Sequence, residues 1–273
     1  MIRLTFLGTG TSQGIPVISC RCWVCASNDA RDQRLRSSAM IEAGGARIVI
    51  DAGPDFRQQM LRHRVDRLDA ILLTHEHKDH IGGIDDVRAF NYTSGRPVDV
   101  YATERVQLTV RKDFDYAFGD HRYPGVPDIN LHTIDPDRPF TVARGGGVPV
   151  AAGASEGEGP RGVEVVPISG MHYTLPVLGF RIGGVAYLTD FNSIEESEIA
   201  KLRGVEVLVI NALRRENHIS HFSLDQALHV AWQVGAGRTL LTHVSHQMGR
   251  YAQINSELPP WASFAYDGQV VDL

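Results

Sequence analysis

The sequence has few cysteines and no excess of positive charge. Its three cysteines, in 273 residues, all lie between positions 20 and 25, and an odd number so close together cannot form a disulfide framework within the chain. Lys and Arg number 27 against 32 Asp and Glu, which gives a formal net charge of -5. This balance argues against a long nucleic acid as partner but leaves small anionic substrates open.

The sequence also lacks long hydrophobic runs and a recognisable targeting segment. It begins Met-Ile-Arg-Leu-Thr-Phe-Leu-Gly-Thr-Gly, whose apolar part is too short for a secretory signal. No run of about 18 apolar residues occurs, so we expect a cytoplasmic protein with no membrane partner. With 43% hydrophobic and 22% charged residues, the chain can fold as one large α/β domain or two small ones.

What the sequence does contain is a dense group of metal-ligand residues, Thr-His-Glu-His-Lys-Asp-His at positions 74–80. The apolar run before it predicts a strand that ends where the ligands begin. On an extended backbone, His75 and His77 leave the same face and can bind one ion. Asp79 and His80 follow a turn, where we expect a helix to start. Four such ligands indicate two ions roughly 3.5 to 4 Å apart, although a solvated His-rich turn is the alternative.

Short apolar, β-branched runs recur along the chain and predict strands. These are Arg3–Leu7, Ala46–Ile50, Ala70–Leu73, Val98–Ala102, Val163–Ile168, Leu178–Ile182, Val185–Thr189, Val205–Ile210 and Thr239–Thr242. Helices are predicted at Asp55–Arg64, Thr103–Phe114, Ile194–Lys201 and Leu224–Val234. Capping boxes formed by Ser193 with Glu196 and by Ser223 with Gln226 predict where the last two helices begin. The mixture predicts an α/β fold.

Four residues with ligand chemistry directly follow predicted strands. They are Asp51, His75, Asp190 and His243. Because α/β proteins commonly place their sites at such strand ends, the repetition favours one shared site. For any one of the four taken alone, a capped turn or an ordinary surface side chain is an equal alternative.

These motifs resemble those of the metallo-β-lactamase superfamily. In chain order they are Leu7-Gly8-Thr9-Gly10, Ile50-Asp51-Ala52-Gly53, the cluster at 74–80, His172, Leu188-Thr189-Asp190 and Thr242-His243. Within that superfamily the chain is most similar to the PhnP-type phosphodiesterases of the carbon-phosphorus lyase pathway. The closer likeness rests on Cys20-x-Cys22-x-x-Cys25 and on Thr242-His243-Val244-Ser245-His246-Gln247. It implies a single αββα sandwich domain over residues 1–273, with a dinuclear site at the edge where the sheets meet.

The resemblance also implies which residues bind the active-site metals. One ion takes His75, His77 and His172, the other takes Asp79, His80 and His243, and Asp190 bridges the two. A carboxylate can bridge because it has two oxygens, whereas an imidazole normally serves one ion. Without the resemblance, His172 would be read as a solvated histidine in a turn. We interpret Asp51 as accepting the second N–H of a ligating imidazole. Manganese, zinc and iron all suit these ligands.

The cysteine cluster predicts a second kind of metal site. Three cysteines and one histidine form a recurrent structural zinc site, and the resemblance supplies His246 as the fourth ligand of Cys20, Cys22 and Cys25. Such a zinc would fix the excursion near residues 19–26 to the segment that carries His243. The alternatives are buried free thiols and a redox or nucleophilic role.

The metal ligands predict a reaction as well as a site. Two divalent cations lower the pKa of bound water from 15.7 to about 7, so a bridging hydroxide can attack a phosphodiester. We assign catalytic roles to Asp79, as a metal ligand, and to His221, which resembles the family's general acid for the departing alkoxide. His218 is the fallback for this acid. A histidine near the helix cap without any catalytic role is the alternative to both.

The leading hypothesis is therefore a metal-dependent phosphodiesterase that acts on a small substrate, such as a cyclic nucleotide or cyclic phosphoribosyl ester. An RNA-processing nuclease, a thioester hydrolase and a lactam hydrolase are alternatives within the superfamily. A scaffold protein with closed structural metals is an alternative outside it. The sequence does not fix the oligomeric state, and a homodimer is one state considered.

Two stretches of the sequence cannot be aligned with the family pattern. Arg144 to Gly162 is rich in glycine and is interpreted either as a lid or as a tolerated surface insertion. Asp113 to Asn130 carries several aromatic residues and is interpreted either as a wall of the substrate pocket or as core packing.

Overall fold

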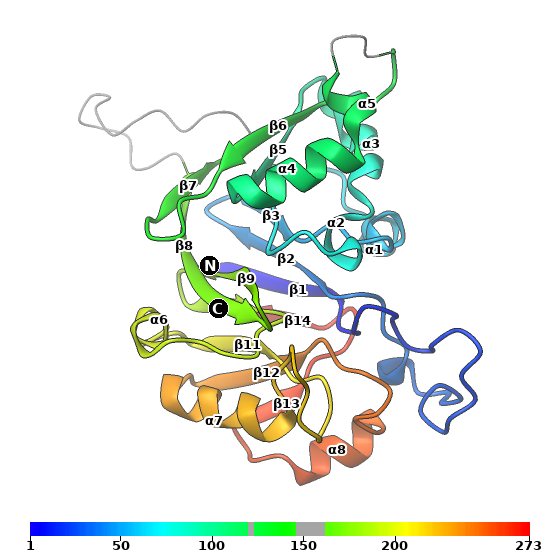
Figure 1. The fold of residues 1–273 in the computed structure, drawn as a ribbon, viewed down its shortest axis with the longest axis vertical. Helices are drawn as coiled ribbons and strands as arrows, with labels where there is room; N and C mark the ends of the chain where they lie inside the picture. The colour runs from blue at the N-terminus through cyan, green and yellow to red at the C-terminus, as the bar shows by residue number, and fades with distance from the viewer. Residues whose placement is uncertain (120–122, 146–161) are drawn as a thin grey trace.

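Two seven-stranded sheets lie face to face in the computed structural model, which describes residues 1–119, 123–145 and 162–273 (Figure 1). The first sheet has the order β14 (Val270–Asp272), β1 (Ile2–Gly8), β2 (Ser38–Ala43), β3 (Ala46–Ile50), β4 (Ala70–Leu72), β5 (Val98–Ala102) and β6 (Ile129–Thr133). The second has the order β13 (Ala262–Phe264), β12 (Arg238–Thr242), β11 (Val207–Asn211), β10 (Val185–Leu188), β9 (Leu175–Ile182), β8 (Gly162–His172) and β7 (Phe140–Ala143).

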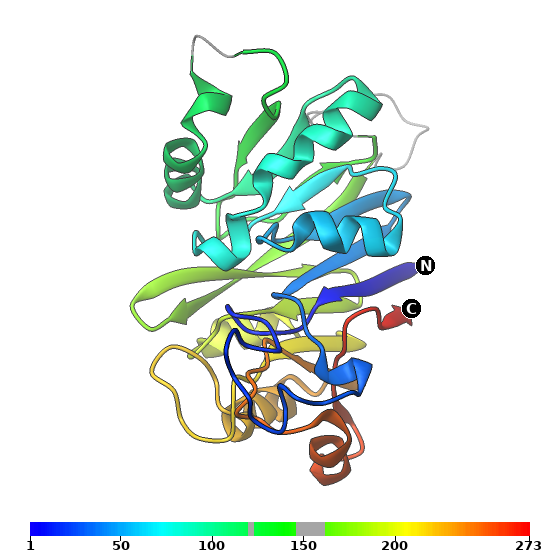
Figure 2. The ribbon, with the colours of Figure 1, turned by 90° about the vertical axis from the view of Figure 1, so that its right-hand side faces the viewer.

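Helices cover the outer face of each sheet and complete the predicted αββα sandwich (Figure 2). The first sheet is covered by α1 (Phe56–His63), α2 (Lys78–Ile81), α3 (Arg88–Ser94), α4 (Glu104–Asp113) and α5 (Asp115–Phe118), and the second by α6 (Glu196–Lys201), α7 (Leu224–Val234) and α8 (Tyr251–Glu257). Two short 3-10 turns lie at Ala30–Asp32 and Ile84–Val87. The sheets bury a common core in which Phe6 and Ile48 pack with Phe180, Tyr187 and Val209. Burying these large apolar side chains is the main force that holds the sheets together.

The two sheets repeat one pattern of strand directions. We read the first sheet from β14 and the second from β7. In each, three antiparallel pairings are followed by three parallel ones, and the parallel pairings begin at β3 in the first sheet and at β10 in the second. Because parallel strands end at the same edge, the residues that follow β3, β4, β10 and β12 gather there. Asp51 after β3 and Asp190 after β10 have nearly equal positive φ angles of 63° and 64°.

Most predicted elements are present, with two corrections at helix starts and strand ends. Helix α7 has the predicted bounds and begins with the predicted capping box of Ser223 and Gln226. The capping box of Ser193 with Glu196 is wrong, because α6 begins two residues later than predicted and its N-cap, Glu195, accepts no hydrogen bond through its side chain. His172 is also not in a turn, because it is the last residue of β8.

The aromatic stretch after α4 packs into the core. Phe114 is buried in the cluster between the first sheet and its helices, and Tyr116 and Phe118 pack against the same cluster. The core-packing interpretation therefore holds for these residues. Most of the glycine-rich stretch near 144–162 lies outside the described residues, as do residues 120–122. Within the described ranges, no helix combines the length and apolarity needed to cross a bilayer.

Candidate metal centre

The histidine motif spans the loop that follows β4 and the first residues of α2. Its first half is extended and its second half is helical, since His77 is the N-cap of α2 with φ -64° and ψ 148°. The predicted helix start at Asp79 and His80 is therefore confirmed. This change of backbone directs the first two histidines and the last two ligand candidates to neighbouring points.

Three histidines from two distant segments converge beside this loop. The rings of His75 and His77 have centroids 4.6 Å apart, and the ring of His172 is 5.5 Å and 5.0 Å from them. One ring nitrogen from each of the three lies within 4.8 Å of the others. His172 donates its Nδ1 proton to the carbonyl of Ser220 at 2.7 Å, which leaves Nε2 available to a cation.

Asp190 lies at the centre of a second group. Its Oδ2 is 3.2 Å from Nε2 of His80 and 3.3 Å from Nδ1 of His243, and Oδ2 of Asp79 is 3.1 Å from the same His80 nitrogen. His75 also lies within 4.8 Å of His80 and Asp190 through its nearest ligand atom, so the two groups adjoin. All seven residues that the sequence nominated for the active-site metals are thus brought together.

Asp51 supports the second group from behind. Its Oδ2 accepts a hydrogen bond from Nδ1 of His80 at 2.7 Å, as predicted, and its carboxylate also accepts from the amide and hydroxyl of Thr74. This arrangement fixes the His80 ring with Nε2 facing Asp79 and Asp190. The carboxylate, which is fully buried, is the kind of partner that orients metal-ligating imidazoles.

The electrostatics of the pocket favour a positive charge. Burial alone would lower the pKa of His80, but Asp190, Asp79 and Asp51 together hold it well above its usual range. His243 and His80 in turn hold the pKa of Asp190 well below its usual range, although burial opposes them. Nε2 of His75 is buried and has no hydrogen-bond partner among the described residues. A buried polar nitrogen without a partner is costly, so this histidine and the carboxylates beside it fit one or more divalent cations.

The backbone around this group is strained. Asp190 and His243 have φ angles of 64° and 55°, in the left-handed region that non-glycine residues seldom adopt. Each such residue costs on the order of 1–3 kcal/mol, and such costs concentrate at functional sites. This backbone conformation directs both side chains toward the edge of the sandwich, just after β10 and β12 end.

His221 lies on the opposite side of Asp190. Its Nδ1 is 3.6 Å from Oδ1 of Asp190, and its ring is 4.5 Å from that of His172. Burial lowers its pKa to about 3, even though the charge of Asp190 acts in the other direction. The position suits a proton donor to a substrate, but His221 is also within ligand distance of the same centre. The ring centroid of His218 is 5.3 Å from that of His221.

The cysteine cluster forms a separate, closed group. Nδ1 of His246 lies 3.3, 3.4 and 3.5 Å from the sulfurs of Cys20, Cys22 and Cys25. Burial alone would raise the pKa of Cys22, but hydrogen bonds from the Cys25 amide and from His246 outweigh it and lower the pKa to about 6. Burial raises the pKa of Cys25 to about 11. Four such ligand atoms converging on one point suit zinc.

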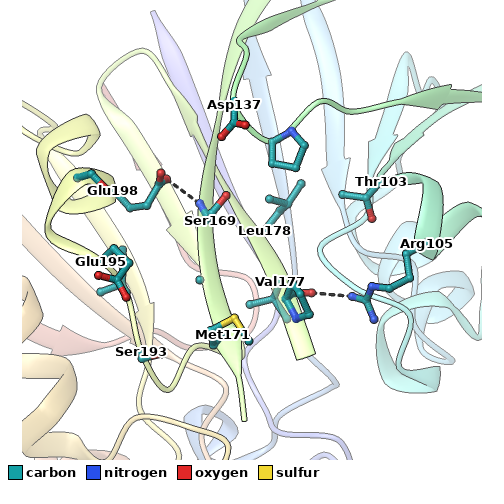
Figure 3. Close-up of a pocket in the computed structure, with 15 residues that line it drawn as sticks. Thr103, Arg105, Asp137, Ser169, Met171, Val177, Leu178, Ser193, Glu195 and Glu198 are labelled. Atoms are coloured by element: carbon teal, nitrogen blue, oxygen red, sulfur yellow. Dashed lines mark hydrogen bonds between the residues drawn. The ribbon is translucent and has the colours of Figure 1, made fainter. Parts of the chain in front are cut away.

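A cavity of about 470 Å³ lies against the β8–β9 hairpin (Figure 3). The outer face of the β8–β9 hairpin contributes Met171 and Val177 to its wall, and Arg105 and Glu198 line it from opposite sides. None of the candidate metal ligands lines it. The sequence did not predict this cavity.

Several polar partners of the histidines were also not predicted. Ser37 and Thr189 contact Nδ1 of His243, and Thr11 contacts its Nε2 at 3.3 Å. Thr189 is the only one of these with a signal in the sequence, because it directly precedes Asp190 in a motif. Ser37 and Thr11 lie more than 200 positions from His243, and only the fold brings them close.

Comparison with known proteins agrees with this architecture. The sequence model of the family described as the beta-lactamase superfamily domain matches residues 46–244. A Porphyromonas gingivalis protein called octanoyltransferase is 40% identical over 269 residues, which cover 98% of this chain and 51% of that protein. The chain thus spans about half the length of this relative. Coenzyme PQQ synthesis protein B of Methylorubrum populi is 27% identical over 286 residues, covering 97% of this chain and 85% of that protein.

Solved structures show the same fold. A crystal structure described as a new diphosphatase from the PhnP family has a TM-score of 0.86 and 33% identity, and the match covers 100% of this chain and 98% of that one. Zinc-bound PqqB from Methylobacterium extorquens has a TM-score of 0.74 at 19% identity, covering 99% and 100% of the two chains. The short form of human tRNase Z has a TM-score of 0.66 at 17% identity, covering 99% and 98%.

Proposed function

Because this chain belongs to the metallo-β-lactamase superfamily, we propose that it is a metal-dependent hydrolase of small phosphodiesters, similar to PhnP-type enzymes. One observation carries the proposal. Two adjoining groups of ligand atoms, mostly buried and from segments far apart in the sequence, meet around the single carboxylate of Asp190. Likeness over nearly the full length to a PhnP-family diphosphatase supports the phosphoryl chemistry.

We assign the ligands as the sequence predicted them. His75, His77 and His172 would hold one divalent cation, Asp79, His80 and His243 would hold the other, and Asp190 would contact both. Bound divalent cations supply Lewis acidity, which lowers the pKa of water and draws negative charge from a phosphoryl group. Manganese and zinc both suit this mixture of imidazole and carboxylate ligands, and iron does as well.

The remaining polar groups have separate tasks. Asp51 keeps the His80 imidazole in one tautomer, because its carboxylate takes the Nδ1 proton. The Ser220 carbonyl does the same for His172. His221 would protonate the departing alkoxide, since it faces the same centre from the side opposite His80. A phosphodiester anion next to His221 favours the protonated ring and so opposes the effect of burial on its pKa.

The proposal is tested by hydrolysis assays on the metal-loaded protein. We expect turnover of bis(p-nitrophenyl) phosphate, and a screen of cyclic nucleotides, cyclic phosphoribosyl esters and linear phosphodiesters to identify the preferred class. Removing the metals with a chelator should abolish the activity, and manganese or zinc should restore it. Protein that holds its metals and cleaves none of these phosphodiesters would refute the proposal.

A second candidate is the hydrolysis of an acyl ester or thioester. It is favoured by the 40% identity to the protein called octanoyltransferase, whose name refers to acyl transfer. That name describes a whole protein, half of which has no counterpart in this chain. Parallel assays on p-nitrophenyl octanoate and an octanoyl thioester separate the two candidates. A higher kcat/KM for the acyl substrates than for every phosphodiester would favour the second.

We further propose that the cysteine group holds a structural zinc. Cys20, Cys22 and Cys25 lie in the excursion after β1, and His246 lies in the segment that follows β12, so one ion would tie these segments together. Arg250 reinforces the contact, because its guanidinium donates to the Trp23 carbonyl and stacks on the Trp23 ring. A closed set of four ligands leaves no position for a substrate.

Replacing Cys22 with Ser should remove this zinc and destabilise the fold. At a free zinc concentration about 1,000 times the dissociation constant, binding stabilises a protein by about 4 kcal/mol. We expect Cys22→Ser to hold one zinc fewer per chain by elemental analysis and to melt at a lower temperature. After chelator treatment, wild type and variant should melt at the same temperature. A variant with unchanged zinc content and melting temperature would contradict the assignment.

A further inference from the structure

Helix α4 contacts two residues of the histidine motif, Glu76 and Lys78, which lie between the motif's candidate ligands. Arg105, the second residue of the helix, forms an ion pair with Glu76, which lies between His75 and His77. Asp113, the last residue of the helix, forms an ion pair with Lys78. The non-ligand residues of the motif therefore attach the loop to a helix that no prediction from the sequence connected with the site.

Arg105 makes a second contact that reaches the other segment of the first histidine group. Its Nη1 pairs with Oε1 of Glu76, and its Nη2 donates to the Pro176 carbonyl at 2.6 Å, drawn as a dashed line in Figure 3. Pro176 lies in β9, next to the residue that pairs with His172 across the hairpin. One guanidinium thus joins the loop of His75 and His77 to the hairpin whose first strand ends at His172.

The carboxylate of this pair is largely buried. The Glu76 side chain is 18% exposed, and its Oε2 is buried without a hydrogen-bond partner among the described residues, whereas the Arg105 side chain is 39% exposed. A partly buried carboxylate is destabilising unless a cation compensates it. At the other end of the helix, Asp113 is 22% exposed and its partner Lys78 is 65% exposed, so water screens that pair more strongly.

We propose that Arg105 is a positioning residue of the metal centre, which holds His75, His77 and His172 at binding distance before their cation arrives. The proposal rests on the metal assignment of the proposed function. A planar guanidinium with several donors can satisfy a carboxylate and a carbonyl at once, whereas a lysine offers a single point charge. Arg105 therefore fixes the separation of the two segments as well as neutralising Glu76.

The second group of candidate ligands has different supports. His80 is held by Asp51 at 2.7 Å, and His243 is held by Ser37 and Thr189 at 3.2 Å and 3.3 Å. None of these contacts involves α4. Loss of Arg105 should therefore weaken one ion much more than the other, a selectivity that general destabilisation of the fold would not produce.

The test measures the affinity of each ion in Arg105→Met. We expect the ion held by the three histidines to bind about 10–100-fold more weakly, as is typical when a partner that orients ligands is lost. The other ion should lose less affinity, because the contacts that hold His80 and His243 stay in place. Zinc competition against a chromophoric chelator, on protein whose cysteine site stays filled, gives both dissociation constants. Lys112→Met, which removes a charge from the same helix, is the matched control.

Glu76→Gln tests the same ion pair through its other member. It keeps the proposal testable if Arg105→Met does not fold. It should cause a smaller loss at the same ion, because Arg105 keeps its contact with the Pro176 carbonyl, and adding Arg105→Met should remove the remainder. Arg105→Lys should recover only part of the affinity. Equal dissociation constants in wild type and Glu76→Gln, or an equal loss at both ions, would overturn this proposal. Wild type that binds no ion at these histidines would refute the proposed function instead.

Discussion

Replacing Asp190 with Asn is expected to reduce phosphodiester hydrolysis by on the order of 10³-fold or more, which exceeds the loss of a single stabilising donor. Oδ2 of Asp190 lies 3.2 Å from His80 and 3.3 Å from His243, and its Oδ1 faces His221. An amide of the same shape carries no charge and turns an N–H₂ toward one of these positions. It can therefore neither bridge two cations nor balance their charge.

The measurement is kcat/KM on bis(p-nitrophenyl) phosphate together with the metal content of the variant. Asp137→Asn is the control, because it removes an exposed carboxylate of the neighbouring cavity that takes no part in the metal centre. We expect Asp190→Asn to retain its fold by circular dichroism and to hold fewer active-site ions than wild type. Full activity in Asp190→Asn would remove the basis of the bridging assignment.

Replacing His221 with Ala should slow hydrolysis by an amount that depends on the leaving group. An alkoxide is a strong base and needs a proton as it departs, so its release should slow by about 10²–10⁴-fold, the usual contribution of a general acid. p-Nitrophenolate is a weak base and leaves without protonation. Its release from the variant should therefore be close to that from wild type. The comparison requires one alkyl and one p-nitrophenyl phosphodiester, measured with saturating metal.

His218→Ala is the natural control for this experiment, because His218 lies beside His221 but belongs to none of the groups of candidate metal ligands. It should affect neither substrate strongly. An equal loss for both leaving groups in His221→Ala would mean that His221 binds a metal, since its ring nitrogen also lies within ligand distance of His172 and Asp190. An alkyl-specific loss in His218→Ala instead would transfer the acid role to that residue.

The metal centre was predictable because its signals are local. The motif at 74–80 holds four ligand candidates in one short loop, and their alternation along the backbone determines which of them share a point. Asp190 and His243 could be nominated because each follows an apolar strand. His172 depended on the family resemblance alone, because neither a flanking helix nor a paired ligand marks it. Its place at the end of β8, opposite His75, depends on the packing of the hairpin.

The parts that could not be predicted depend on contacts between distant segments. Strand β2 was missed because Glu42 interrupts its apolar pattern, although Gly44-Gly45, both with positive φ, form the tight turn to β3. The shared strand pattern of the two sheets has no counterpart in a sequence repeat. In the sequence, Arg105 looks like an ordinary helical arginine. Only the fold brings it into contact with Glu76, 29 positions earlier in the chain, and with the hairpin.

The location of bound metal tests the central claim most directly. Crystals grown with manganese or zinc should show two anomalous scattering peaks on either side of Asp190, one among His75, His77 and His172 and the other beside His80 and His243. Zinc-grown crystals should show a third peak among the three cysteines and His246. A filled cysteine site with no peak near Asp190 would contradict the account.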